Sequence, residues 1–213
     1  MVKDIKKIMP DILEVEFDRF VNQFVRYLPK KTTPGQVTII GFIGAVIAGF
    51  SLYLASFNRY FFFLAVIGLF MHLVCDAWDG ALARERHMES EAGFILDSFL
   101  DNVGLGFCVS LGIALSSYAN FTLYMFGIIS YLFTMTLEYL EMLTARVWTF
   151  PLFGAFEFKV AIMITSVLAF FWPGKILFGL GWFNLFGIPV VAGAYLYVIY
   201  GFFALLKEVQ DRG

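Results

Sequence analysis

The sequence predicts an all-α membrane protein, and three observations lead to this class. Of the 213 residues, 60% are hydrophobic and only 15% are charged, whereas a soluble domain has about 25% charged residues. Several apolar runs approach or exceed the roughly 20 residues that a membrane-spanning helix requires. Phenylalanine occurs 27 times, which favours a surface exposed to lipid. With a net charge of -2, no nucleic-acid partner is expected.

Six membrane spans are expected within a single domain that covers residues 1–213. They lie at about 36–57, 60–84, 91–116, 120–144, 155–172 and 184–206. Polar or helix-breaking residues separate them, among them Asn58 and Pro173. The first thirty residues mix Lys, Asp and Glu and lack the apolar core of a cleavable signal peptide. The first span is therefore expected to act as its own insertion signal.

The distribution of basic residues predicts the orientation. An even number of spans places both termini on one side of the membrane. With the N-terminus in the cytoplasm, all 15 lysines and arginines except Arg59 and Lys175 fall in cytoplasmic segments, as the positive-inside rule requires. We therefore expect cytoplasmic termini, and location in the plasma membrane if the host is prokaryotic.

Residues 11–30 have a different pattern. Apolar residues recur at helical spacing between Leu13 and Leu28, whereas polar residues such as Asp18 and Gln23 occupy other faces. This periodicity predicts an amphipathic helix that lies in the cytoplasmic interface. The alternative is a soluble helix packed against the bundle.

Small residues form a stripe in the first span, at Gly41, Gly44, Ala45, Ala48 and Gly49. Such stripes let helix backbones approach closely, either within one chain or between two. Packing within the chain is the favoured interpretation. The stripe also allows the homodimer that we expect for this protein.

Four aspartates within residues 76–101 are the most informative feature. Asp76 and Asp79 are three residues apart, and Asp97 and Asp101 are four apart, so each pair shares a helical face. The short connection between the second and third spans makes these helices antiparallel neighbours. The four carboxylates are therefore expected to meet just below the cytoplasmic interface.

Acidic side chains in a membrane are costly and require compensation. Carboxylate oxygens are the preferred ligands of hard divalent cations. We expect two such ions, Mg²⁺ or Mn²⁺, and a pair of metals suits displacement at phosphorus. This constellation predicts chemistry on phosphate groups.

Small and basic residues accompany the aspartates. Gly80, Ala83 and Gly93 leave room for a bulky ligand near the backbone. Arg84 is a planar, permanently charged donor that suits a phosphate. The alternatives are helix packing for the small residues and a topology anchor for Arg84. His72 lies one turn before Asp76, where a packing role or a supporting role beside the metals is expected.

The pattern D-x2-D-G-x2-A-R-x8-G-x3-D-x3-D resembles the signature of the CDP-alcohol phosphotransferases, which are integral membrane enzymes of phospholipid synthesis. Every fixed position is present with the expected gaps. The six-span topology and the N-terminal amphipathic helix are also similar to that family. Thr33, Pro34 and Thr38 resemble the family's TPNxxT opening of the first span, with Gly35 where asparagine is usual.

The resemblance implies a reaction in which an alcohol hydroxyl attacks the β-phosphorus of a CDP-linked lipid or CDP-alcohol, and CMP leaves. It implies that Asp76, Asp79 and Asp97 are metal ligands. Asp101 would complete the metal site and act as the general base. The implied pocket for cytidine and diphosphate consists of Asp79, Gly80, Ala83, Arg84 and Gly93.

Residues beyond the motif bear on the alcohol acceptor. The expected acceptor-binding candidates are Glu138, Glu141, Arg146, Glu157 and Lys159. An acid-rich pocket suits an acceptor with an amine, such as serine or ethanolamine, whereas inositol phosphate or glycerol phosphate would need the two cations. The amine-bearing alcohol is slightly favoured. Alternatively, the glutamates form ordinary ion pairs with the two cations or point into headgroup water.

A cation- or proton-coupled transporter is the competing function, because acids in membrane segments often mark ion pathways. Transporter sites usually lie near the midplane between repeated halves. Here the aspartates are expected near one interface, and no internal repeat is evident. The enzyme is therefore the favoured hypothesis.

Overall fold

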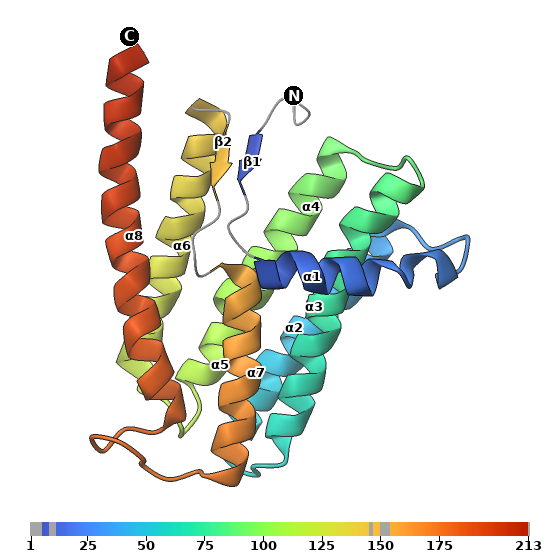
Figure 1. The fold of residues 1–213 in the computed structure, drawn as a ribbon. Coiled ribbons are helices and arrows are strands. Elements are labelled where there is room, and N and C mark those ends of the chain that lie inside the picture. Colours follow the sequence, from blue (N-terminus) through green and yellow to red (C-terminus); the bar gives the residue numbers. More distant parts are fainter. Residues whose placement is uncertain (1–5, 9–11, 145–146, 150–153, 213) are drawn as a thin grey trace.

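The computed structural model describes residues 6–8, 12–144, 147–149 and 154–212. Figure 1 shows a bundle of long helices. These are α2 (Pro34–Leu54), α3 (Phe61–Glu85), α6 (Phe121–Thr144), α7 (Ala155–Phe171) and α8 (Trp182–Arg212). Another rod consists of α4 (Glu91–Asp101), η3 (Asn102–Val109) and α5 (Ser110–Ala114). The expected helical class is confirmed.

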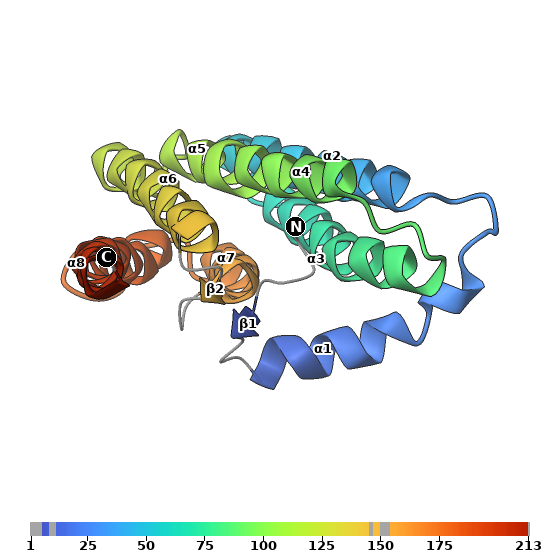
Figure 2. The same ribbon diagram turned by 90° about the horizontal axis from the view of Figure 1, so that it is seen from above.

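The helices form two rows when the bundle is seen from above. Figure 2 shows α2, α4–α5 and α6 in one row, with α3, α7 and α8 in the other. Strand β1 and the last turns of α8 lie at the same end of the bundle (Figure 1). Within the described residues, five helical segments are long and apolar enough to cross a membrane: Pro34–Leu54, Phe61–Glu85, Glu91–Ala114, Phe121–Thr144 and Trp182–Gln210.

Helix α7 takes the place of the fifth expected span but has only 17 residues. It begins deeper in the bundle than the neighbouring ends of α6 and α8 (Figure 1). This late start places the first turns of α7 at the level of the aspartates. The helix ends at Phe171, just before Pro173, which cannot donate a helical hydrogen bond.

Helix α2 is positioned by a strong start signal and a small-residue face. The hydroxyl of Thr33 accepts from the Gln36 backbone N–H, while the Gln36 side chain accepts from the Thr33 N–H. A Cβ atom added to Gly44 would lie 2.6 Å from the backbone oxygen of Gly68 on α3. The small-residue stripe therefore packs within this chain, as favoured by the sequence interpretation.

The N-terminal amphipathic segment is shorter than the sequence predicted. Helix α1 covers Ile12–Asn22 and is followed by a single 3-10 turn, η2 (Val25–Tyr27). Val25 is 1% exposed and packs with Val37, Cys75 and Leu82. A continuous helix over 11–30 does not form. Helix α1 lies across the long helices, beside α3 (Figures 1 and 2).

Two side chains, one in α3 and one directly after it, hold this N-terminal region through hydrogen bonds. The Trp78 Nε1–H donates to the Val21 carbonyl at 2.9 Å. The Arg86 guanidinium donates to the carbonyls of Pro29 and Lys30, both at 3.1 Å, and also to those of Leu28 and Thr32. The linker into α2 is therefore tied to the end of α3.

One parallel strand pair is an addition that the sequence did not predict. Strand β1 (Lys6–Ile8) pairs with β2 (Val147–Thr149), with Lys6 opposite Val147. Strand β2 lies in the connection between α6 and α7. The pairing joins the N-terminal segment to the connection between two helices that line the candidate site.

Candidate active site

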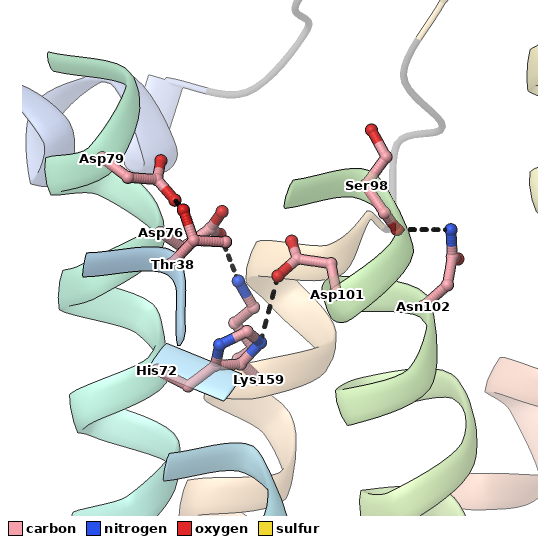
Figure 3. A network of polar contacts seen from close by, with 8 residues as sticks. All are labelled: Thr38, His72, Asp76, Asp79, Ser98, Asp101, Asn102 and Lys159. Atoms are coloured by element: carbon pink, nitrogen blue, oxygen red, sulfur yellow. Dashed lines mark hydrogen bonds and ion pairs between the residues drawn. The ribbon is translucent and has the colours of Figure 1, made fainter. Parts of the chain in front are cut away.

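Three of the four motif aspartates converge on one point between α3 and α4. Carboxylate oxygens of Asp76, Asp97 and Asp101 all lie within 4.8 Å of one another. Asp79 lies beside Asp97 and interacts with it. The Thr38 hydroxyl of α2 donates to the Asp79 carboxylate at 2.7 Å (Figure 3). The predicted antiparallel arrangement of two helices thus brings the acids together.

The connection between α3 and α4 is short, and Ser90 caps the N-terminus of α4. The hydroxyl of Ser90 accepts from the Gly93 N–H at 3.0 Å, which fixes the first turn of α4. This cap positions Asp97 and Asp101 one and two turns further along. Gly93 itself is exposed at this helix start.

A π-helix follows directly after Asp101, where the sequence predicted regular helix. Segment η3 covers Asn102–Val109, and such wide turns occur often at functional sites. The Asn102 amide donates to the Ser98 carbonyl at 2.7 Å and to the Tyr139 hydroxyl at 3.2 Å. Gly104 lies so close to α2 that an added Cβ would be 2.9 Å from the Cβ of Ala45. Local periodicity does not reveal this widening, because it depends on neighbouring helices.

Lys159 is the most unexpected member of the site. Its side chain is 1% exposed, and its ammonium group forms an ion pair with Asp76 (Figure 3). The Asp76 side chain is 32% exposed. The sequence placed Lys159 among candidate acceptor contacts, whereas the structure brings it to the aspartate cluster. A buried lysine next to several carboxylates supplies part of the positive charge that the cluster requires.

His72 of α3 also lies next to the cluster. It is 2% exposed, and its Nε2 is 3.7 Å from an oxygen of Asp101. Figure 3 shows the ring pointing from α3 toward Asp101. The spacing of one turn before Asp76 gave the only sequence signal for this contact.

The predicted nucleotide-pocket residues lie where α3 ends and α4 begins, with Gly93 in the first turn of α4. Gly80 and Ala83 are half-buried, whereas Arg84 is exposed. A Cβ added to Gly80 would lie 3.4 Å from the Arg84 guanidinium. The Arg84 side chain therefore lies alongside the bare backbone of Gly80, with Asp79 next to it in sequence.

A cavity of about 720 Å³ opens from the aspartates into the bundle. At one end it is lined by Asp76, Asp97 and Asp101. It continues between α6, α7 and α8 as far as Tyr124 and Phe183, where the Tyr124 hydroxyl donates to the Phe183 carbonyl at 2.7 Å. Most of its lining is apolar. None of the described residues that line it is a lysine, arginine or histidine.

The predicted acceptor residues separate into different environments. Glu138 is 6% exposed and lines the cavity. Glu141 is not among the cavity-lining residues that the structure describes. Glu157 caps α7 by accepting from the Gly154 N–H at 2.7 Å, and Lys159 pairs with Asp76. Arg146 lies outside the described residues.

The aspartate cluster fits a divalent metal. Its donors are carboxylate oxygens, which Mg²⁺ and Mn²⁺ prefer. The Oδ1 atom of Asp97 is buried and has no hydrogen-bond partner in the described part of the chain. A buried acceptor of this kind is costly without a partner, and a bound cation would provide one.

Comparison with known proteins identifies the family. The sequence model of the CDP-alcohol phosphatidyltransferase family matches residues 31–200. This chain belongs to that family. The resemblance inferred from the aspartate motif is therefore confirmed.

Individual relatives are more distant. Cholinephosphotransferase 1 from Danio rerio is 27% identical over 206 residues, covering 88% of this chain and 52% of the relative. This chain thus spans about half the length of that protein. Archaetidylinositol phosphate synthase from Pyrococcus horikoshii is 42% identical over 71 residues, which is 33% of this chain and 35% of that protein.

A solved structure has the same fold. It is the crystal structure of Mycobacterium tuberculosis phosphatidylinositol phosphate synthase with CDP-DAG bound. The TM-score is 0.59 at 17% sequence identity, with 90% of this chain and 92% of the other covered. At this identity the likeness concerns the fold alone.

Proposed function

We propose that this protein transfers a substituted phosphate from a CDP-linked donor to an alcohol hydroxyl and releases CMP, as a step of phospholipid synthesis. The observation that carries this proposal is the convergence of Asp76, Asp97 and Asp101 within 4.8 Å in a chain of this family. The fold shared with a structure that contains CDP-DAG supports a CDP-linked lipid as donor.

In this mechanism Asp76, Asp79 and Asp97 would hold two divalent cations, Mg²⁺ or Mn²⁺, and Asp101 would complete the site. The cations would neutralise the diphosphate and stabilise the leaving phosphate. Asp101 accepts the proton of the acceptor hydroxyl. The alcohol oxygen then bonds to the β-phosphorus, and the bond to CMP breaks with its electron pair on CMP. Thr38 holds Asp79 in place through the hydrogen bond described above.

The nucleotide would bind beside the aspartates where α3 ends and α4 begins, with Asp79, Gly80, Ala83, Arg84 and Gly93 as the pocket. The exposed Arg84, whose guanidinium lies beside the Gly80 backbone, supports this placement because a guanidinium there can contact phosphate. Alanine at Gly80 should therefore weaken CDP binding more than alanine at a distant glycine such as Gly174.

For the acceptor, we propose an alcohol that carries an amine. Glu138 is buried in the cavity wall, and the described lining offers no cation for a phosphate ester. The relatives' names point to both kinds of acceptor, since one is a cholinephosphotransferase and one an archaetidylinositol phosphate synthase. The acceptor panel must therefore contain both kinds.

We further propose six spans, cytoplasmic termini and an active site on the cytoplasmic side, in the plasma membrane if the host is prokaryotic. The shared end of β1 and α8 and the excess of basic residues in the expected inner segments support this orientation. A homodimer stays a prediction that cross-linking in native membranes would test.

The decisive experiment measures CMP release by the purified protein with Mg²⁺ or Mn²⁺. CDP-diacylglycerol and CDP-archaeol are each offered with serine, ethanolamine, inositol phosphate and glycerol phosphate, and CDP-ethanolamine is offered with diacylglycerol. One pair should release CMP, and EDTA should stop the reaction. Asp101→Asn should abolish release yet retain CDP-lipid binding. Normal turnover by this variant would remove Asp101 from the mechanism.

The same assay addresses the transporter hypothesis, to which the family match lends no support. Metal-dependent CMP release is expected from the transferase. Ion flux in proteoliposomes without CMP release would instead favour transport.

A further inference from the structure

His72 is a buried polar residue for which the mechanism above has no role. Its ring is 2% exposed, so bulk water does not reach it. The Nε2 atom is buried, has no hydrogen-bond partner among the described residues, and lies 3.7 Å from Oδ1 of Asp101. A buried ring nitrogen left without a partner is costly, and the Asp101 carboxylate is the acceptor toward which it points (Figure 3).

The position of the ring is fixed by close helix packing. A Cβ atom added to Gly41 would lie 2.9 Å from the Cβ of Cys75 and 3.4 Å from Nδ1 of His72. Helix α2 therefore passes close to the imidazole, which is 2% exposed and so is enclosed by neighbouring side chains. Such restraint is what a residue needs in order to orient a neighbouring group.

The lysine near the cluster pairs with a different carboxylate. Lys159 is paired with Asp76, on the α7 side. Asp101 has its own nitrogen contact, with Nε2 of His72 at 3.7 Å, and its side chain is 25% exposed at the cavity. Lys159 thus contacts Asp76, whereas His72 contacts Asp101.

We propose that His72 is a positioning residue for Asp101, which rests on the proposed transfer reaction. In the tautomer with hydrogen on Nε2, the imidazole donates to Oδ1 and turns Oδ2 toward the cavity. The acceptor proton then moves to Oδ2 as the alcohol oxygen bonds to phosphorus and CMP leaves. The 3.7 Å separation is longer than a hydrogen bond and is expected to shorten when both substrates are bound.

The test compares four variants in the CMP-release assay, with the donor and acceptor pair that the wild-type protein uses. His72→Leu removes the donor at similar size and should lower kcat by about 10- to 100-fold. The KM values for the donor and for Mn²⁺ should stay within about twofold, because only the transition state loses the interaction. His72→Gln retains a donor at the place of Nε2 and should recover most of the kcat. His87→Asn, at an exposed loop position with a φ of 54°, is the matched histidine control and should behave as wild type.

Each outcome bears on a defined step. If the leucine variant keeps the wild-type kcat, or raises only KM, the positioning role is wrong. If it does not fold, His72→Gln and His72→Asn decide, since the shorter asparagine amide cannot reach Asp101. Equal rates for these two variants would overturn the inference, whereas a rate near wild type for glutamine alone would support it. A wild-type protein that releases no CMP with any pair would overturn the proposed function and this inference together.

Discussion

Replacing Lys159 by methionine should make the stability of the protein depend on divalent metal. Methionine has a similar length but no charge, so the substitution removes the cation that pairs with Asp76. The remaining carboxylates of Asp97 and Asp101 lie within 4.8 Å of Asp76. Without the lysine, their mutual repulsion is uncompensated until a metal binds.

The magnitude follows from the burial of the two partners. Removing one partner of a fully buried ion pair costs about 3–5 kcal/mol. Lys159 is 1% exposed, but the Asp76 side chain is 32% exposed, and solvent therefore reduces the cost to about 1–3 kcal/mol. For a chain of this size, a loss of about 2 kcal/mol lowers Tm by roughly 4–8 °C. A metal at one hundred times its Kd stabilises the folded state by about 2.7 kcal/mol.

The assay is thermal unfolding in detergent, followed by tryptophan fluorescence with EDTA or with increasing Mn²⁺. The Lys159→Met variant should unfold several degrees below wild type in EDTA and gain more from Mn²⁺ than wild type does. Lys175→Met changes an exposed lysine in the loop before α8 and should match wild type in both conditions. Equal metal responses of the Lys159 variant and wild type would refute the proposed charge compensation.

Three further predictions test contacts around the site. Thr38→Val removes the 2.7 Å hydrogen bond to Asp79. Because a hydrogen bond to a charged group contributes about 1.5–3 kcal/mol, kcat/KM in the CMP-release assay should fall roughly 10- to 100-fold. An unchanged kcat/KM would contradict the role of Thr38. Arg86→Gln releases the linker carbonyls and should speed tryptic cleavage after the exposed Lys30 and Lys31; equal cleavage rates would argue against the anchor. Glu138→Gln should raise KM for an amine-bearing acceptor about tenfold or more, while KM for the CDP donor stays the same. A rise in the donor KM instead would indicate that Glu138 binds the nucleotide.

The aspartate cluster was predictable because its geometry is local. Helical spacing places Asp76 with Asp79 and Asp97 with Asp101, and a short connection makes the two helices neighbours. The apolar lengths likewise predicted the helical class. These features depend on intervals of a few residues, which a single sequence displays directly.

The contacts between distant elements were not predictable in this way. Lys159 lies 83 positions from Asp76 along the chain, so only the packing of α7 against α3 reveals the ion pair. The start of α7 deep in the bundle and the π-helix after Asp101 also depend on neighbouring helices. The end of α1 at Asn22 was also not predicted, because the apolar periodicity continues past it to Leu28.

The charges at the site explain why such a cluster can exist inside a membrane protein. Four aspartates against Lys159 leave three uncompensated negative charges if all are ionised, since four minus one is three. Two divalent cations would change this to a net charge of plus one, which attracts a diphosphate. The same acids would therefore repel a nucleotide before metal binds and favour it afterwards. Because the adjoining cavity is mostly apolar, this change of sign acts in surroundings that screen charge weakly. Lys159 thus reduces the repulsion among the carboxylates when no metal is bound. Its single charge is not enough to bind the diphosphate donor alone.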